Sequence, residues 1–157
     1  MKKEFRTKNL LSPLALSPRF IEVFGCIVLE GGTSELLPQK EPESPEDRQK
    51  VEYVLNRREV WELFEVPPPE PSPRLLCEAG NTIRDAWEAR LISEFPGRRF
   101  VVYFEYAPPV CDVGFFQALD WHIEAADQAK TSRGTHRVDW RPKLTSGPLM
   151  KTTKGRQ

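Results

Sequence analysis

Residues 98–106 read Arg-Arg-Phe-Val-Val-Tyr-Phe-Glu-Tyr, and this stretch gives the clearest secondary-structure signal in the chain. Its side chains alternate between two faces, which is the period of a β-strand rich in aromatic and β-branched residues. One face carries Phe100, Val102, Phe104 and Tyr106, and the other carries Val101, Tyr103 and Glu105. Pro108-Pro109 ends the strand, and the apolar residues of 110–119 predict a strand that pairs back on it.

A further strand is predicted over residues 20–29. Aromatic and β-branched residues occupy both of its faces, which is typical of a strand well inside a sheet. Gly31-Gly32 ends it.

Two helices are predicted from their start signals and their apolar stripes. Ser44-Pro45 and Ser72-Pro73 each place a capping serine before a proline at the first helical position. Apolar residues then recur close to every 3.6 positions, which predicts helices over 45–64 and 73–95. The proline-rich spacer 66–73 between them cannot be helical and is expected to be stiff.

The order of these elements favours the α+β class, because helices and strands do not alternate regularly. We predict a small, mostly antiparallel sheet of three or so strands, covered on one face by the two long helices. Residues 19–127 form this single domain, with a short helix expected over 120–130. Residues 1–18 are predicted to be an irregular basic segment. Residues 128–157 lose all hydrophobic periodicity and are predicted to be a disordered basic tail.

Charge is segregated along the chain, although the formal net charge is zero. Residues 1–8 carry four basic and one acidic side chain, a net of +3, and residues 128–157 carry eight against one, a net of +7. The stretch between them carries 11 basic and 21 acidic side chains, a net of −10. The basic ends therefore either fold back onto the acidic body or face an anionic partner.

The acidic body predicts a small non-enzymatic protein that binds another macromolecule, as accessory or neutralising proteins do. An acidic edge speeds encounter with a basic partner protein, and aromatic side chains anchor the complex. The candidate partner-binding residues are acidic or aromatic, namely Trp61, Tyr106, Trp121, Glu62 and Glu65.

The basic tail supports a second hypothesis, a nucleic-acid or ribonucleoprotein-associated factor. Lysine and arginine neutralise phosphates, and a tryptophan can stack on a base. The candidate residues are Arg133, Arg137, Trp140, Arg141 and Lys143. The tail has no Arg-Gly repeat and no compact basic block, so neutralisation against the acidic body is the alternative.

A third hypothesis is a cysteine-dependent enzyme. Cys111 is the candidate nucleophile, with His122 as its base and Asp120 to orient the imidazole. No glycine-flanked nucleophile signature surrounds Cys111, and an extended strand would hold it far from His122. We therefore assign no catalytic residue.

Several classes of protein are disfavoured by what the sequence lacks. The cysteines and histidines do not have the close spacing of a structural zinc site, and no glycine-rich phosphate loop is present, so neither a metal nor a cofactor is predicted. No apolar run is long enough to span a membrane. Three widely spaced cysteines do not make a disulfide framework, which favours a reducing, cytoplasmic setting.

Overall fold

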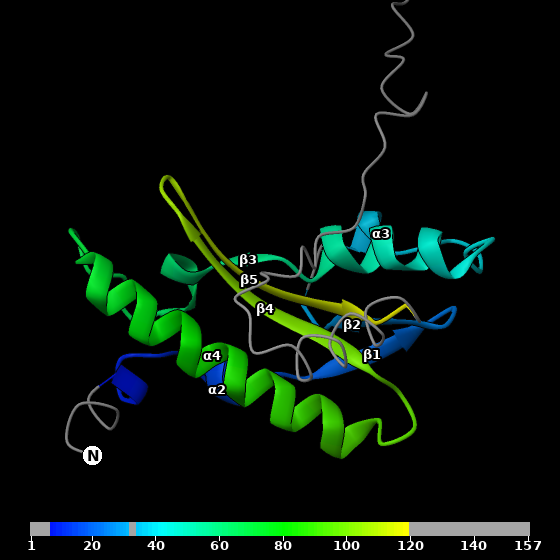
Figure 1. The fold of residues 1–157 in the computed structure, drawn as a ribbon, viewed down its shortest axis with the longest axis horizontal. Helices are drawn as coiled ribbons and strands as arrows, with labels where there is room; N and C mark the ends of the chain where they lie inside the picture. Colours follow the sequence, from blue (N-terminus) through cyan, green and yellow to red (C-terminus); the bar gives the residue numbers. More distant parts are fainter. Residues whose placement is uncertain (1–6, 32–33, 120–157) are drawn as a thin grey trace, which may run out of the picture.

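The computed structural model describes residues 7–31 and 34–119, and over these ranges the protein has an α+β fold with two small antiparallel sheets (Figure 1). The predicted fold class is therefore confirmed. The strands are β1 (Phe20–Val23), β2 (Cys26–Leu29), β3 (Arg58–Glu59), β4 (Phe100–Ala107) and β5 (Val110–Gln117). The helices are α2 (Pro13–Leu16), α3 (Pro45–Leu55) and α4 (Pro73–Glu94), with the 3₁₀ turns η1 (Ser34–Leu36) and η2 (Val60–Leu63).

The larger sheet has the strand order β3-β5-β4, and all of its pairs are antiparallel. Strands β4 and β5 pair from Phe100 opposite Gln117 to Ala107 opposite Val110. The two strands predicted from residues 98–106 and 110–119 are thus confirmed, and they form one long hairpin.

Helix α4 begins where the sequence predicts, because the hydroxyl oxygen of Ser72 accepts the N–H of Leu75 at 3.1 Å. Its buried stripe, which includes Ile83 and Trp87, packs against β4 and β5. Gly80 lies where the helix comes closest to the sheet. A Cβ atom at Gly80 would lie only 2.2 Å from the ring of Phe104, so the absent side chain is what lets the two elements touch.

Helix α3 ends at Leu55, nine residues before the predicted end of the helix. Its start is as predicted, with the N–H of Asp47 donating to Ser44 Oγ at 3.1 Å. The chain leaves the helix at Asn56, enters β3, and then forms η2. The apolar spacing that predicted a helix to residue 64 continues through a 3₁₀ turn, which has nearly the same period.

The two long helices lie on opposite faces of the larger sheet, whereas the sequence placed both on one face (Figure 1). Residues that face α4 include Val102 and Phe115, which are opposite one another in the β4–β5 register. The neighbouring positions Tyr103 and Phe116 point the other way and pack against Tyr53 of α3. Because side chains alternate across a strand, the two clusters are on different sides of the sheet.

Residues 20–29 form a hairpin, β1–β2, and the predicted single strand is therefore corrected. Phe24 and Gly25 have φ angles of 49° and 81°, which is the pattern of a two-residue type I′ turn. Such turns usually carry Asn-Gly, and a phenylalanine at the first position hides the turn from sequence reading.

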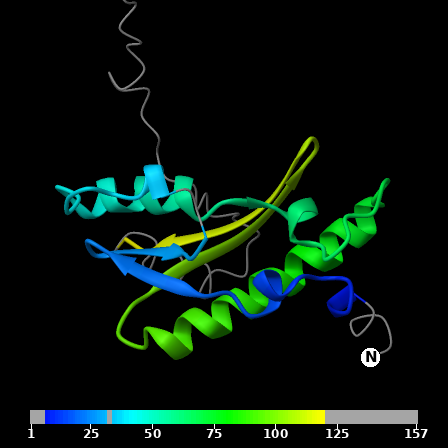
Figure 2. The same cartoon turned by 180° about the vertical axis from the view of Figure 1, so that it is seen from behind.

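Part of the predicted N-terminal segment belongs to the folded body. Leu11 forms a bridge with Phe64, and both Leu11 and Ala15 are buried in the core beside α4. Figure 2 shows α2 lying against α4 from behind. The core therefore begins before residue 19.

The two sheets are joined by side chains. The Oδ1 atom of Asn56 accepts the N–H of Leu29 at 3.0 Å, and its Nδ2 atom donates to the carbonyl of Ile27 at 2.8 Å. The same Nδ2 atom donates to the carbonyl of Phe115 in β5 at 3.3 Å. The side-chain amide of Asn56 thus takes the place of a peptide group from a neighbouring strand.

Candidate functional site

A row of three carboxylates crosses the larger sheet. Glu59 of β3 is directly opposite Asp112 of β5, and Asp112 is directly opposite Glu105 of β4. Residues that are opposite in antiparallel strands share a face, so the three side chains stand on the same side of the sheet. This acidic row, Glu59–Asp112–Glu105, is on the face that carries Tyr103.

Asp112 at the centre of the acidic row is almost buried. Burial raises the pKa of its carboxyl group, and the nearby Glu105 and Glu62 raise it further. Arg57 opposes them, with its Nε atom 3.2 Å from Asp112 Oδ2. The charge of Asp112 is therefore costly in the free protein, and Arg57 offsets only part of that cost.

Aromatic side chains adjoin the acidic row. The rings of Tyr53 and Tyr103 stack with their centroids 5.8 Å apart. The guanidinium group of Arg57, which pairs with Asp112, lies 6.0 Å from the centroid of Tyr53. Acidic, cationic and aromatic groups are thus brought together from α3, β4, β5 and the link between α3 and β3.

The predicted partner-binding residues are distributed over several places. Glu62 is exposed in η2, and its charge raises the pKa of Asp112. Trp61 beside it is half-buried. Glu65 is exposed and follows η2, where its N–H donates to the carbonyl of Leu10. Tyr106 packs against the core on the α4 side of the sheet, away from the acidic row. Trp121 lies outside the described residues.

None of the three carboxylates of the acidic row, and not Arg57 beside them, was among the predicted site residues. Glu105, Asp112 and Arg57 come together only through strand pairing and through the exit of the chain from α3. A signal was available in the alternation of residues 98–106, which puts Glu105 on one face. The register that places Asp112 opposite it was not readable.

Cys111 is buried in the core that faces α4. Burial raises the pKa of its thiol to about 11, with smaller contributions from Cys77, Asp112 and Glu59. A thiol in that environment holds its proton at neutral pH, which does not favour nucleophilic attack. His122 and Asp120, its proposed companions, lie outside the described residues, as do the tail residues Arg133, Arg137, Trp140, Arg141 and Lys143.

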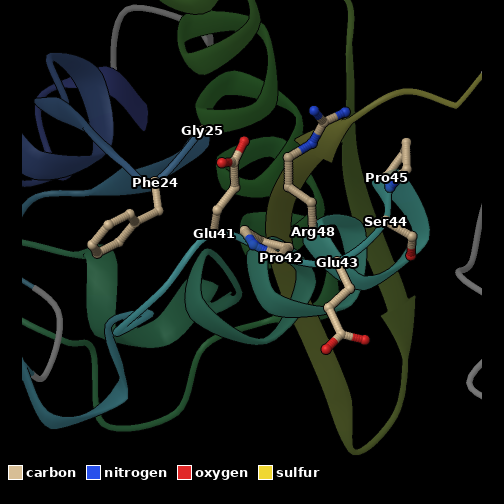
Figure 3. Close-up of a pocket in the computed structure, with 8 residues that line it drawn as sticks. All are labelled: Phe24, Gly25, Glu41, Pro42, Glu43, Ser44, Pro45 and Arg48. Atoms are coloured by element: carbon tan, nitrogen blue, oxygen red, sulfur yellow. The ribbon is translucent and has the colours of Figure 1, made fainter.

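A small pocket lies between the β1–β2 turn and the start of α3 (Figure 3). Its volume of about 190 Å³ is below the usual range of small-molecule sites. Glu41 and Glu43 both line it, but Figure 3 shows their side chains pointing in different directions. They do not form a carboxylate pair that could carry acid–base chemistry.

Within residues 7–31 and 34–119, no cluster of three or more His, Cys, Asp or Glu side chains is arranged to hold a metal ion. Across the same residues, no helix is both long enough and apolar enough to cross a bilayer. Comparisons with protein-family models, with curated proteins and with solved structures gave no match.

Proposed function

We propose that this protein is a non-enzymatic accessory or neutralising protein that binds a basic partner protein through the acidic row and the aromatic residues beside it. The observation that carries the proposal is the direct opposition of Glu59, Asp112 and Glu105 across three strands. Glu62, one of the residues predicted from the sequence to bind the partner, adds a further negative charge from η2.

The energetics of the row support a role in binding. Like charges directly opposite one another destabilise an antiparallel pair, by an amount within the ~0.2–1 kcal/mol range of cross-strand pairs. A basic partner converts that repulsion into attraction, and it also accelerates encounter. Trp61, which is half-buried next to Glu62, supplies apolar contact area near the charges. The buried stack of Tyr53 and Tyr103 supports the face from beneath.

The cytoplasm is the setting we propose for this activity. Cys26, Cys77 and Cys111 are all free thiols, and free thiols persist most readily in a reducing compartment.

Two double variants of equal net charge test the binding face. Glu59→Gln with Glu62→Gln removes two charges at the row, and Glu30→Gln with Glu88→Gln removes two exposed charges elsewhere. The probe is a ten-residue lysine peptide, titrated against the full chain at low and at physiological salt. We expect the row variant to lose at least tenfold in affinity and the control less than twofold. Equal affinities for the two variants would contradict the proposal.

A nucleic-acid partner for the basic tail is the rival outcome of the same series. Its signature is binding of a single-stranded oligonucleotide that is lost when residues 131–157 are deleted and is unchanged in the row variant. Such binding should fall steeply with salt, because it depends on neutralised phosphates.

A further inference from the structure

Glu52 is a fully buried carboxyl group on α3, at the place where the two sheets meet. Its Oε2 atom accepts the backbone N–H of Gln117 at 3.0 Å, and its Oε1 atom accepts Nε2 of the same residue at 2.7 Å. Arg48, one turn earlier on α3, places its Nε atom 3.5 Å from Oε1. Glu52 therefore binds α3 to the end of β5.

The same contacts reach the β1–β2 hairpin. The Nε2 atom of Gln117 also donates to the carbonyl of Gly25 in the hairpin turn, at 2.9 Å. We propose that the Glu52 carboxyl group is a proton-controlled latch for the β1–β2 hairpin, which separates locally from α3 and β5 more readily when Glu52 is ionised. This proposal does not depend on the binding face.

The surroundings of Glu52 explain why its charge is expensive. Burial raises the pKa of Glu52 to about 7, although the hydrogen bonds from Gln117 and the charges of Arg48 and Arg98 favour the ionised form. Arg98 precedes β4 and also pairs with Glu22 of β1. Desolvation outweighs these partners because no part of the Glu52 side chain reaches water.

Within residues 7–31 and 34–119, the remaining titratable group beside Glu52 is the thiol of Cys26 on β2. Burial, followed by the charge of Glu52, raises the pKa of Cys26 to about 11. A guanidinium group does not lose its proton in a protein. Within this described cluster of Glu52, Arg48, Arg98 and Cys26, Glu52 is therefore the group that changes charge between pH 5.5 and 8.5.

The direction of the effect follows from proton linkage. When the hairpin is closed the Glu52 pKa is about 7, and when the carboxyl group is exposed to water its pKa returns to its ordinary value of 4.5. The closed form thus binds the proton more tightly, and raising the pH favours the open form. From pH 5.5 to 8.5 the opening equilibrium constant should rise roughly 30-fold.

Cys26 is a built-in reporter of this opening, because it is fully buried on β2 beside Glu52. The full chain is labelled with a thiol reagent at several pH values, and each cysteine is followed by peptide mass spectrometry. Dividing the rate at Cys26 by the rate of a free thiol peptide at the same pH gives the open fraction. We expect that fraction to rise roughly 30-fold between pH 5.5 and 8.5 in the wild type.

Two matched variants separate the ionisation of Glu52 from other causes of a pH response at Cys26. Glu52→Gln cannot ionise, so the open fraction at Cys26 should change less than twofold over this pH range. Glu46→Gln, an exposed change on the same helix, should keep the wild-type response. A pH response that survives in Glu52→Gln would overturn the proposal.

Cys111 serves as an internal control in every sample. It is buried against α4 at the start of β5, whereas Gln117 is at the end of that strand. A local opening of the hairpin should therefore give Cys26 a much larger open fraction than Cys111 at every pH. Equal open fractions at Cys26 and Cys111 would mean that both thiols react only through global unfolding, and would refute a local latch. If Glu52→Gln does not fold, amide exchange at Leu29 and Gln117 in the wild type tests whether the hairpin opens more readily as the pH rises. Exchange that shows no extra acceleration with pH beyond its intrinsic chemistry would also overturn the proposal.

Discussion

Glu52 and Asn56 lie one helical turn apart at the end of α3, and both side chains bond to the same edge of β5. Glu52 accepts the N–H of Gln117 at 3.0 Å, and Asn56 donates to the carbonyl of Phe115 at 3.3 Å. Strand β3 pairs with β5 only at residues 112 and 113. Beyond that point the end of the helix satisfies the β5 edge that a longer strand would otherwise cover.

Replacing Asn56 should be among the most damaging single changes to the fold. Asn56→Ala leaves the carbonyl of Ile27 and the N–H of Leu29 buried without their partner. Each such group costs about 1–3 kcal/mol, so we expect the free energy of unfolding to fall by about 3 kcal/mol. Urea denaturation measures the loss, and amide exchange at Leu29 should accelerate with it.

Asn81→Ala is the matched control for that change. Asn81 is exposed on α4, and its side-chain amide donates to the carbonyl of Cys77 in its own helix. Alanine has the higher helix propensity, so the free energy of unfolding should stay within about 0.5 kcal/mol or rise. Equal losses for the two variants would mean that Asn56 does not join the sheets.

Gly80→Ala should destabilise the protein even though it improves the helix propensity of α4 by about 1 kcal/mol. The new methyl group would overlap the ring of Phe104, and overpacking of this kind costs about 1–3 kcal/mol. Gly97→Ala is the control, because no atom lies within 4 Å of a Cβ atom there. A stabilised Gly80→Ala variant would show that α4 does not need this close approach.

Phe24→Asn should stabilise the β1–β2 hairpin. Phe24 has a φ of 49° and is 52 % exposed, so it is held in a left-handed conformation with little packing in return. Asparagine adopts this conformation far more readily, so we expect the free energy of unfolding to rise by about 1 kcal/mol. Thermal denaturation measures this gain. Phe24→Leu, which keeps the conformational cost, should give no gain. A loss of stability in Phe24→Asn would instead assign the ring a packing role.

Stability should fall as the pH rises from 5 to 8, opposite to the usual acid sensitivity. A carboxyl group whose pKa is raised on folding stabilises the protein fully below its unfolded pKa, and that contribution is lost as the pH rises through the folded pKa. The pKa of Glu52 is 4.5 in the unfolded chain and about 7 in the folded protein. This difference corresponds to a loss of about 2–3 kcal/mol in the free energy of unfolding over this pH range. The raised pKa of Asp112 acts in the same direction. Urea midpoints at several pH values measure the slope, and an equal slope in Glu52→Gln would contradict this origin.

The elements that the sequence predicted well are those whose signal is local. Helix α4 has a serine cap and a stripe that keeps its phase for 22 residues, so neither Gly80 nor Asn81 could hide it. The β4–β5 hairpin combines strict alternation with a proline pair at its turn. In both cases local propensity and tertiary packing favour the same structure.

The features that the sequence did not predict depend on distant partners. Helix α3 stops at Asn56 because the amide there is needed by Ile27 and Leu29, which are almost thirty residues earlier. The acidic row joins Glu59 to Asp112 through a strand register that no local pattern contains. The charge imbalance of the body was readable, but the positions at which the carboxylates gather were not.

Because the place of the β1–β2 hairpin is set by Asn56, it does not depend on the length of the chain that connects them. Between Leu29 and the cap of α3, the described residues 30–31 and 34–43 form no strand of either sheet. Insertions in this connection should therefore be tolerated during evolution, since the hairpin would still meet the same amide. The link from Asn56 to β3 is the single residue Arg57. A change in the length of this link would shift the Asn56 amide relative to the larger sheet.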